Sequence, residues 1–159
     1  SKRLCFAGER SDTSSACVRV IQWDTGVTCG ELGQHARGRA ASCSFKPNRP
    51  IRIATGGKDD SKCYFNAGPP FKRVVDGTPT DDVHVKGAVN CLRFSSDGTK
   101  IVSAGADKTV ALYDGKTMAL SAKLENVHTG TIYACAWNSN DSFVLTCSAD
   151  GTAKLIAVC

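Results

Sequence analysis

A spaced set of polar residues recurs three times along the 159-residue chain and constrains its fold more than any other feature. Each set begins with a His, continues with a Ser or Thr, and has an Asp four residues after that hydroxyl residue. A strand-like position follows the Asp by six residues. The sets are His35/Thr55/Asp59/Phe65, His84/Ser103/Asp107/Tyr113 and His128/Thr146/Asp150/Ile156. The separation from His to Asp is 24, 23 and 22 residues, which predicts a series of equivalent structural units.

A period in the forties, with a His early and an Asp-bearing turn late, is typical of the WD40 repeat. Each repeat of this kind supplies four antiparallel strands, which form one blade of a β-propeller. No segment of the chain has sustained helical periodicity. The predicted fold is therefore all-β, a partial propeller of about three and a half four-stranded antiparallel blades.

The repeat also predicts how the chain divides. Residues 1–34 are assigned to a partial first blade, 35–76 to a second, 77–125 to a third and 126–159 to a partial fourth, all within one propeller domain. A closed propeller needs about four complete blades or more. Because an open array leaves strand edges unpaired, we expect this chain to be a piece of a longer protein or to associate with itself through those edges.

The repeated polar residues are predicted to be structural. The imidazole can donate to the Asp carboxylate in the turn between the second and third strands, while the Ser or Thr hydroxyl pairs with the other ring nitrogen. In WD40 repeats a Trp in the third strand usually completes this network. Here that position holds Phe65, Tyr113 or Ile156, and only Trp23, followed by Asp24 in the first blade, keeps the Trp-Asp pair.

Two other interpretations of the same residues are less favoured. A hydrolase triad of Ser, His and Asp would not recur in three copies at structural spacing, and the chain has no G-x-S-x-G elbow. A metal site is not indicated, because the three His residues belong to separate blades. We therefore expect no catalytic residue, no metal site, no cofactor and no enzymatic activity.

Positive charge is concentrated in one stretch of the chain, whose net charge is +5. Residues 37–73 contain nine basic and two acidic residues, which leaves the remainder slightly negative. A solvated face and a docking surface for an acidic partner are both compatible with this pattern. Nucleic-acid binding is not expected, because no aromatic residues accompany the basic ones in a stacking pattern. No apolar run is long enough to suggest a membrane span.

Nine cysteines occur in the chain, none of them in a C-x-x-C motif. Most alternate with apolar residues in strand-like runs, where a free thiol packs as a small hydrophobe. Free thiols are favoured over disulfides or metal ligands, and they indicate a reducing, cytosolic compartment.

Several segments outside the repeated positions carry a more specific resemblance. They are Trp23-Asp24-Thr25-Gly26, residues 45–56 (FKPNRPIRIATG), Gly68-Pro69-Pro70-Phe71-Lys72, residues 92–100 (LRFSSDGTK) and Tyr113-Asp114-Gly115-Lys116-Thr117. In this order they resemble the actin-interacting protein 1 family over nearly the whole chain. The Lys-Pro-x-Arg-Pro and Gly-Pro-Pro-Phe-Lys pieces are specific, because the blade pattern requires neither.

The resemblance implies a non-enzymatic, cytoplasmic protein of the actin cytoskeleton. Members of that family are two linked seven-bladed propellers that bind actin filaments decorated with ADF/cofilin and promote severing and disassembly. On this basis Glu9 and Phe71 are contact candidates, and the charge pattern adds Lys58, Lys72 and Arg73. For Phe71, packing between blades is an equal alternative. The alternative function is a general WD40 scaffold, such as a ubiquitin-ligase substrate receptor or a subunit of an RNA-processing complex.

Overall fold

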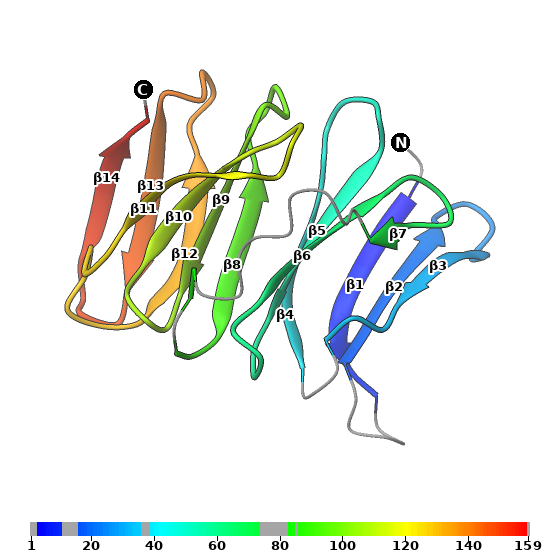
Figure 1. Ribbon diagram of the computed structural model, residues 1–159, viewed down its shortest axis with the longest axis horizontal. Helices are drawn as coiled ribbons and strands as arrows, with labels where there is room; N and C mark the ends of the chain where they lie inside the picture. Colours follow the sequence, from blue (N-terminus) through cyan, green and yellow to red (C-terminus); the bar gives the residue numbers. More distant parts are fainter. Residues whose placement is uncertain (1–2, 11–15, 36–38, 74–82, 85, 159) are drawn as a thin grey trace.

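The computed structural model describes residues 3–10, 16–35, 39–73, 83–84 and 86–158. Within these ranges the regular structure is entirely β, in four antiparallel sheets. The sheets follow one another across the molecule in chain order, from the N-terminal sheet at one side to the C-terminal sheet at the other (Figure 1). The predicted all-β fold of propeller blades is confirmed.

Each sheet is a meander of consecutive strands. The first consists of β1 (Arg3–Glu9), β2 (Ala16–Gln22) and β3 (Thr28–Leu32), in that order. The second consists of β4 (Ala40–Phe45), β5 (Arg52–Gly57), β6 (Cys63–Ala67) and β7 (Lys72–Arg73). The third consists of β8 (Val89–Phe94), β9 (Lys100–Gly105), β10 (Val110–Asp114) and β11 (Leu120–Leu124). The fourth consists of β12 (Ile132–Trp137), β13 (Phe143–Ser148) and β14 (Ala153–Ala157).

The first strands of successive sheets contact one another, β4 with β8 and β8 with β12, while β1 contacts β4. The sheets therefore pack face to face around one side, as blades do in a propeller. Each predicted third strand pairs with the second strand before it in a continuous antiparallel register. Equivalent positions in different sheets can therefore be compared residue by residue.

Apolar side chains fill the spaces between neighbouring sheets. Val18, Val20, Ile53 and Phe71 belong to the cluster between the first and second sheets. The cluster between the second and third includes Phe65, Leu92, Ile101, Tyr113 and Met118. The rings of Phe65 and Tyr113 meet edge to face there, with centroids 5.7 Å apart. The cluster between the third and fourth includes Val102, Val110, Ile132 and Val144. The apolar side chains that stabilise the fold are thus buried where two neighbouring sheets pack against each other.

Candidate functional site

Two of the three repeated polar sets form buried hydrogen-bond networks. His84 lies with Nδ1 3.0 Å from Oδ1 of Asp107 and with Nε2 2.7 Å from Oγ of Ser103. In the fourth sheet, Nδ1 of His128 is 2.9 Å from Oδ2 of Asp150, and its Nε2 is 2.9 Å from Oγ1 of Thr146. Both imidazoles are buried, so each network fixes the loop that enters a sheet to the turn between its second and third strands.

The network of the second sheet uses a different Asp from the predicted one. Nδ1 of His35 is 2.7 Å from Oδ2 of Asp60, and its Nε2 is 3.0 Å from Oγ1 of Thr55. Asp59 is exposed and accepts the backbone N–H of Arg39 at 2.8 Å. The assignment of Asp59 to the network is wrong, because the turn after β5 contains one residue more than the turns after β9 and β13.

The same extra residue shifts the third strand of the second sheet by one residue relative to the second strand, so a different residue lies beside the network. Tyr113 pairs with Ile101 and Ile156 with Val144, and the residue in the equivalent register of the second sheet is Asn66, opposite Ile53. Asn66 is fully buried, and its Oδ1 accepts a hydrogen bond from Nε2 of Gln34 at 2.6 Å. Phe65 is therefore one residue away from the position assigned to it.

Tyr113 extends the network of the third sheet. Its hydroxyl accepts a hydrogen bond from Oγ of Ser103 at 3.4 Å and donates one to Sγ of Cys63, 3.9 Å away across the space between sheets. Burial raises the pKa of this phenol far above its ordinary value. Tyr113 thus takes the place that a third-strand Trp would have.

Trp23 does not have a network role. It lies in the turn after β2 with 66% of its surface exposed. Ile21 pairs with Leu4 and Thr28 just after a bulge, as Tyr113 pairs with Ile101 and Leu120. The register therefore gives the third-strand position to Ile21, and the prediction for Trp23 is wrong.

A glycine beside each of two networks lets the His approach the turn closely. A Cβ on Gly57 would lie 2.6 Å from Nδ1 of His35, and a Cβ on Gly105 would lie 2.8 Å from Nδ1 of His84. Ordinary side chains do not tolerate such contacts, so any other residue at these positions would displace the imidazole. Ser148 stands at the corresponding place in the fourth sheet, so this requirement differs between sheets.

Hydrogen bonds hold two network carboxylates in their ionised form. Burial favours the neutral form of Asp107, but hydrogen bonds from His84 and Thr109 outweigh it and lower its pKa. Hydrogen bonds, first of all from the Thr152 hydroxyl, lower the pKa of Asp150 as well. A carboxylate stabilised in this way is a poor proton acceptor at neutral pH, so the networks have the properties of a framework.

Two predicted contact residues meet on one exposed rim. The Nε of Arg39 is 3.7 Å from Oε2 of Glu9 and 3.7 Å from Oδ2 of Asp59, so it links the end of β1 to the turn after β5. The backbone N–H of Lys58 donates to the Arg39 carbonyl at 2.7 Å. We call Glu9, Arg39, Lys58 and Asp59 the rim cluster. All four side chains are exposed, and they come from the first and second sheets.

Phe71 is buried, with 2% of its surface exposed. Its ring packs in the cluster with Val18, Val20 and Leu32 and lies against Gly30, where a Cβ would approach it to 2.7 Å. In this conformation it fills the space between the first and second sheets and presents no apolar surface to a partner, which agrees with the packing alternative and not with a contact role. Lys72 and Arg73 form β7, and their side chains lie outside the described residues.

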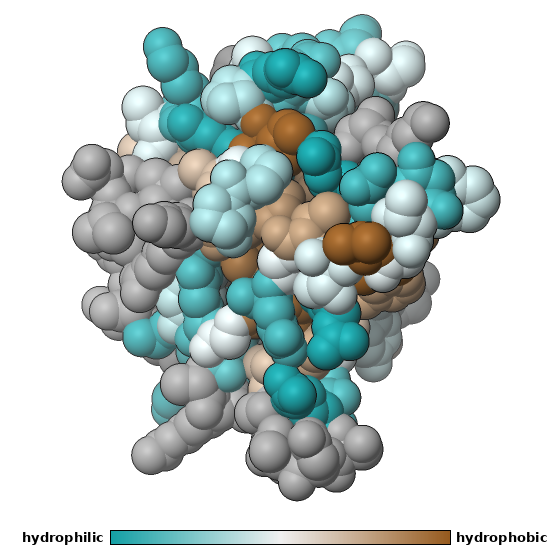
Figure 2. Space-filling model, turned by 90° about the vertical axis from the view of Figure 1, so that its right-hand side faces the viewer, coloured by the Kyte–Doolittle hydropathy of each residue, from teal (hydrophilic) through white to brown (hydrophobic). Residues whose placement is uncertain are grey.

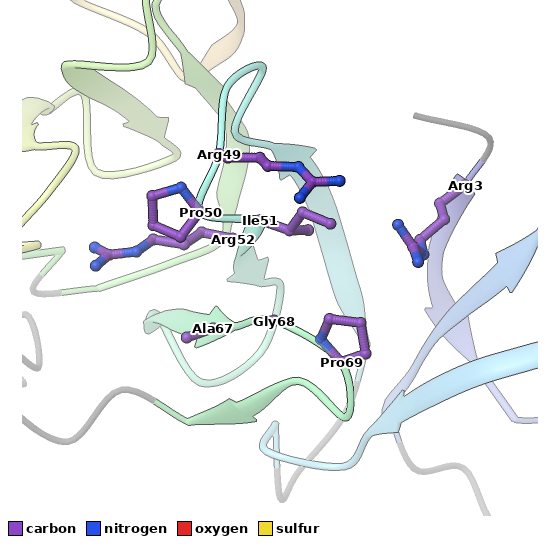
Figure 3. A pocket seen from close by; sticks show the side chains of 8 residues that line it. All are labelled: Arg3, Arg49, Pro50, Ile51, Arg52, Ala67, Gly68 and Pro69. Carbon is purple, nitrogen blue, oxygen red and sulfur yellow. The ribbon is translucent and has the colours of Figure 1, made fainter.

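A basic groove lies at the other end of the first two sheets. Its volume is about 830 Å³, and it is lined by Arg3, Arg49, Pro50, Ile51, Arg52, Ala67, Gly68 and Pro69 (Figure 3). Arg3 comes from β1, and the other lining residues come from the ends of β5 and β6 and the loops beside them. Sequence reasoning noted the basic segment but did not select Arg3, Arg49 or Arg52. The run from Lys46 to Pro50 could have indicated this groove, because it is basic and the blade pattern does not require it.

Comparison with known proteins identifies the repeats. The family model described as "WD domain, G-beta repeat" matches residues 78–114 and 121–156. These two parts of the chain are WD40 repeats. The two matched ranges cover the third and fourth sheets of this WD40 chain, in which two of the buried His networks lie.

Curated relatives match this WD40 chain over most of its length. WD repeat-containing protein 1 of Xenopus tropicalis is 40% identical over 157 residues, 98% of this chain and 24% of the relative. Actin-interacting protein 1-2 of Arabidopsis thaliana is 41% identical over 133 residues, 82% of this chain and 20% of the relative. Actin-interacting protein 1 of Drosophila melanogaster is 37% identical over 159 residues, 99% of this chain and 24% of the relative. The chain thus spans about a quarter of the length of these relatives, and the resemblance to the actin-interacting protein 1 family is confirmed.

Within the residues that the structure describes, no three His, Cys, Asp or Glu side chains are grouped in a way that could hold a metal ion. No helix in the same residues is long and apolar enough to cross a membrane. Figure 2 shows apolar surface among hydrophilic groups on the side of the molecule where the first sheet lies, and Leu4, Phe6 and Val27 of that region are exposed.

Proposed function

We propose that this chain is part of a non-enzymatic, cytoplasmic WD40 protein that binds actin filaments carrying ADF/cofilin and promotes their severing and disassembly. The observation that carries this proposal is 37% identity over 99% of the chain to a relative named actin-interacting protein 1. The predicted division into blades at residues 1–34, 35–76, 77–125 and 126–159 is part of the proposal. So is self-association through strand edges.

The rim cluster is the proposed contact surface. Glu9 and Asp59 flank Arg39, and Lys58 lies beside them, so both signs of charge are exposed within one small area. Such an arrangement suits a partner surface with its own alternating charges, because each ion pair across the interface then has a defined position. Phe71 is assigned to packing instead, since a side chain buried to this degree does not reach a partner.

Cosedimentation with filaments tests the proposal. The full-length protein should pellet with cofilin-decorated actin filaments and shorten them under the microscope, and Glu9→Lys should weaken this binding at least several-fold. The matched control is Asp24→Lys, which makes the same change of charge in the turn after β2. Reversal of Lys58, Lys72 and Arg73 to Glu should weaken binding further, and more strongly at low salt. If decorated filaments neither bind the wild-type protein nor shorten faster, the assignment to actin disassembly is wrong.

A further inference from the structure

The basic groove and the rim cluster lie at opposite ends of the same strands. β1 runs from Arg3 at the groove to Glu9 at the rim, and β5 runs from Arg52 at the groove to Gly57, next to Lys58 at the rim. A seven-residue strand spans about 20 Å. A partner seated on the rim cluster therefore leaves the groove open, and the groove requires an explanation of its own.

The charges lining the groove are all of one sign. Arg3 and Arg49 extend toward one another across it, whereas Arg52 points away (Figure 3) and donates from Nη1 to the carbonyl of Lys116. Nε of Arg3 is buried and has no hydrogen-bond partner among the described residues. None of the eight lining residues is acidic. Two guanidinium groups that converge without a counter-charge repel each other, and an anion placed between them would relieve that repulsion.

The groove continues into a second cavity of about 400 Å³ that shares Arg3, Arg49 and Ile51 with it. Lys46 lines this extension and adds another positive charge, and Phe45 and Pro47 add apolar surface. The groove and its extension are both lined by Arg3 of β1 and by the loop that joins β4 to β5.

The walls of the groove are held in place before any ligand arrives. The N–H of Lys46 donates to the carbonyl of Arg52 at 2.9 Å, and the N–H of Gly68 donates to the carbonyl of Ile51 at 2.7 Å. Nδ2 of Asn48 donates to the carbonyl of Asp97 at 3.0 Å, which ties the loop to the third sheet. Pro47 and Pro50 restrict the backbone of the same loop. Binding to such a surface loses little conformational entropy.

We propose that this groove binds a carboxylate-bearing peptide segment of a partner protein, separately from the rim cluster. The forked guanidinium groups of Arg3 and Arg49 match the planar carboxylate of an Asp or Glu. The apolar wall made by Pro50, Ile51 and Pro69 accommodates an aliphatic side chain next to that carboxylate. A nucleic acid fits less well, because no aromatic ring lines the larger cavity for base stacking. A membrane fits less well because the surface is concave.

Fluorescence anisotropy with a defined probe tests the proposal on the full-length protein. The probe is a labelled, N-acetylated hexapeptide of alternating Glu and Leu, and the same peptide with Gln in place of Glu is its control. The Glu peptide should bind and the Gln peptide should bind at least about tenfold more weakly. Combining Arg3→Gln with Arg49→Gln should weaken binding of the Glu peptide at least about tenfold, whereas Lys86→Gln, which removes one exposed charge elsewhere, should not change it.

Arg49→Gln alone keeps the test decisive if the double variant unfolds, because Arg49 is exposed and its replacement disturbs no packing. It should weaken binding of the Glu peptide at least threefold with an unchanged thermal unfolding midpoint. Equal binding by wild-type and Arg49→Gln proteins would overturn the proposal. Binding confined to inorganic phosphate, or to vesicles containing phosphatidylserine, would overturn it as well. Neither result depends on actin, so this inference and the proposed function can fail independently.

Discussion

Gln34 donates a hydrogen bond from Nε2 to Oδ1 of Asn66, at 2.6 Å, where the loop entering the second sheet meets its third strand. The remaining polar atoms of the pair, Oε1 of Gln34 and Nδ2 of Asn66, are buried without a hydrogen-bond partner among the described residues. The pair therefore combines one good hydrogen bond with two uncompensated desolvation costs. It stands where Tyr113 stands in the third sheet.

A double-mutant cycle at Gln34 and Asn66 should expose this balance. Asn66→Leu alone leaves Gln34 buried with no partner and should lower the free energy of unfolding by about 1–3 kcal/mol. Gln34→Leu combined with Asn66→Leu removes all the unpaired atoms and should recover most of that loss. Urea unfolding of the three variants measures both effects. A double variant less stable than either single variant would contradict this account.

Two adjacent aspartates should behave differently on substitution. Asp60 pairs with the buried His35, so Asp60→Asn should lower the free energy of unfolding by about 1.5–3 kcal/mol. Asp59 is exposed on the rim, and Asp59→Asn should change the free energy of unfolding by less than about 0.5 kcal/mol. Chemical denaturation of the two variants under identical conditions makes the comparison. Equal losses would mean that the two carboxylates share the network.

Acid should weaken the network of the third sheet in a defined direction. The pKa of Asp107 is lower in the folded protein than its ordinary value, so the folded state favours the ionised carboxylate. Its contribution to stability is complete above about pH 4 and is lost as the pH falls through the folded pKa. The free energy of unfolding of Asp107→Asn should therefore fall less steeply than that of the wild-type protein below pH 4. Parallel curves for the two proteins would exclude this linkage.

Cysteine reactivity should follow burial. Burial raises the pKa of the Cys63 thiol to about 12, and the side chain is 6% exposed, so little thiolate is present or accessible at neutral pH. Cys147 is exposed. Iodoacetamide should therefore modify Cys147 well before Cys63 under native conditions, as followed by mass spectrometry of peptides. Denaturation with urea should remove the difference, which serves as the internal control.

Phe71→Ala should lower the stability of the fold, and any loss of partner binding should follow from that loss of stability. Removal of this ring leaves a cavity between the first and second sheets and should lower the free energy of unfolding by about 3–5 kcal/mol. Thermal unfolding measures this loss. A stable Phe71→Ala variant that nevertheless fails to bind filaments would show that Phe71 leaves its buried position when a partner arrives.

The sequence was sufficient for the blade fold, because strand alternation and the spacing of the polar sets depend on local geometry. It was not sufficient to choose between Asp59 and Asp60, since both keep the pattern and only the burial of one carboxylate decides. Trp23 was misplaced for a related reason: the pair Trp23-Asp24 matches a motif, but strand register places Ile21 in the network position.

The surfaces were harder to predict than the framework. The side-chain direction of Phe71 depends on packing between sheets, which spacing along the chain does not reveal. Arg3 and Arg49 are 46 residues apart, and only the contact between the first two sheets brings them to the same groove. Charge counting found the basic segment, but it could not separate groove residues from rim residues within it.

The turn after β5 is one residue longer than the equivalent turns, but the His–Asp hydrogen bond beside it keeps its length. It accommodates one residue more than its counterparts, and yet the distance from His Nδ1 to the Asp carboxylate stays between 2.7 and 3.0 Å in all three sheets. The added length lies at the surface, where two exposed charged residues, Lys58 and Asp59, take the place of the single residue Ala106 of the third sheet. The cost of the extra residue lies instead inside the blade, where it brings Asn66 and its hydrogen bond with Gln34 to the position that Tyr113 holds in the third sheet.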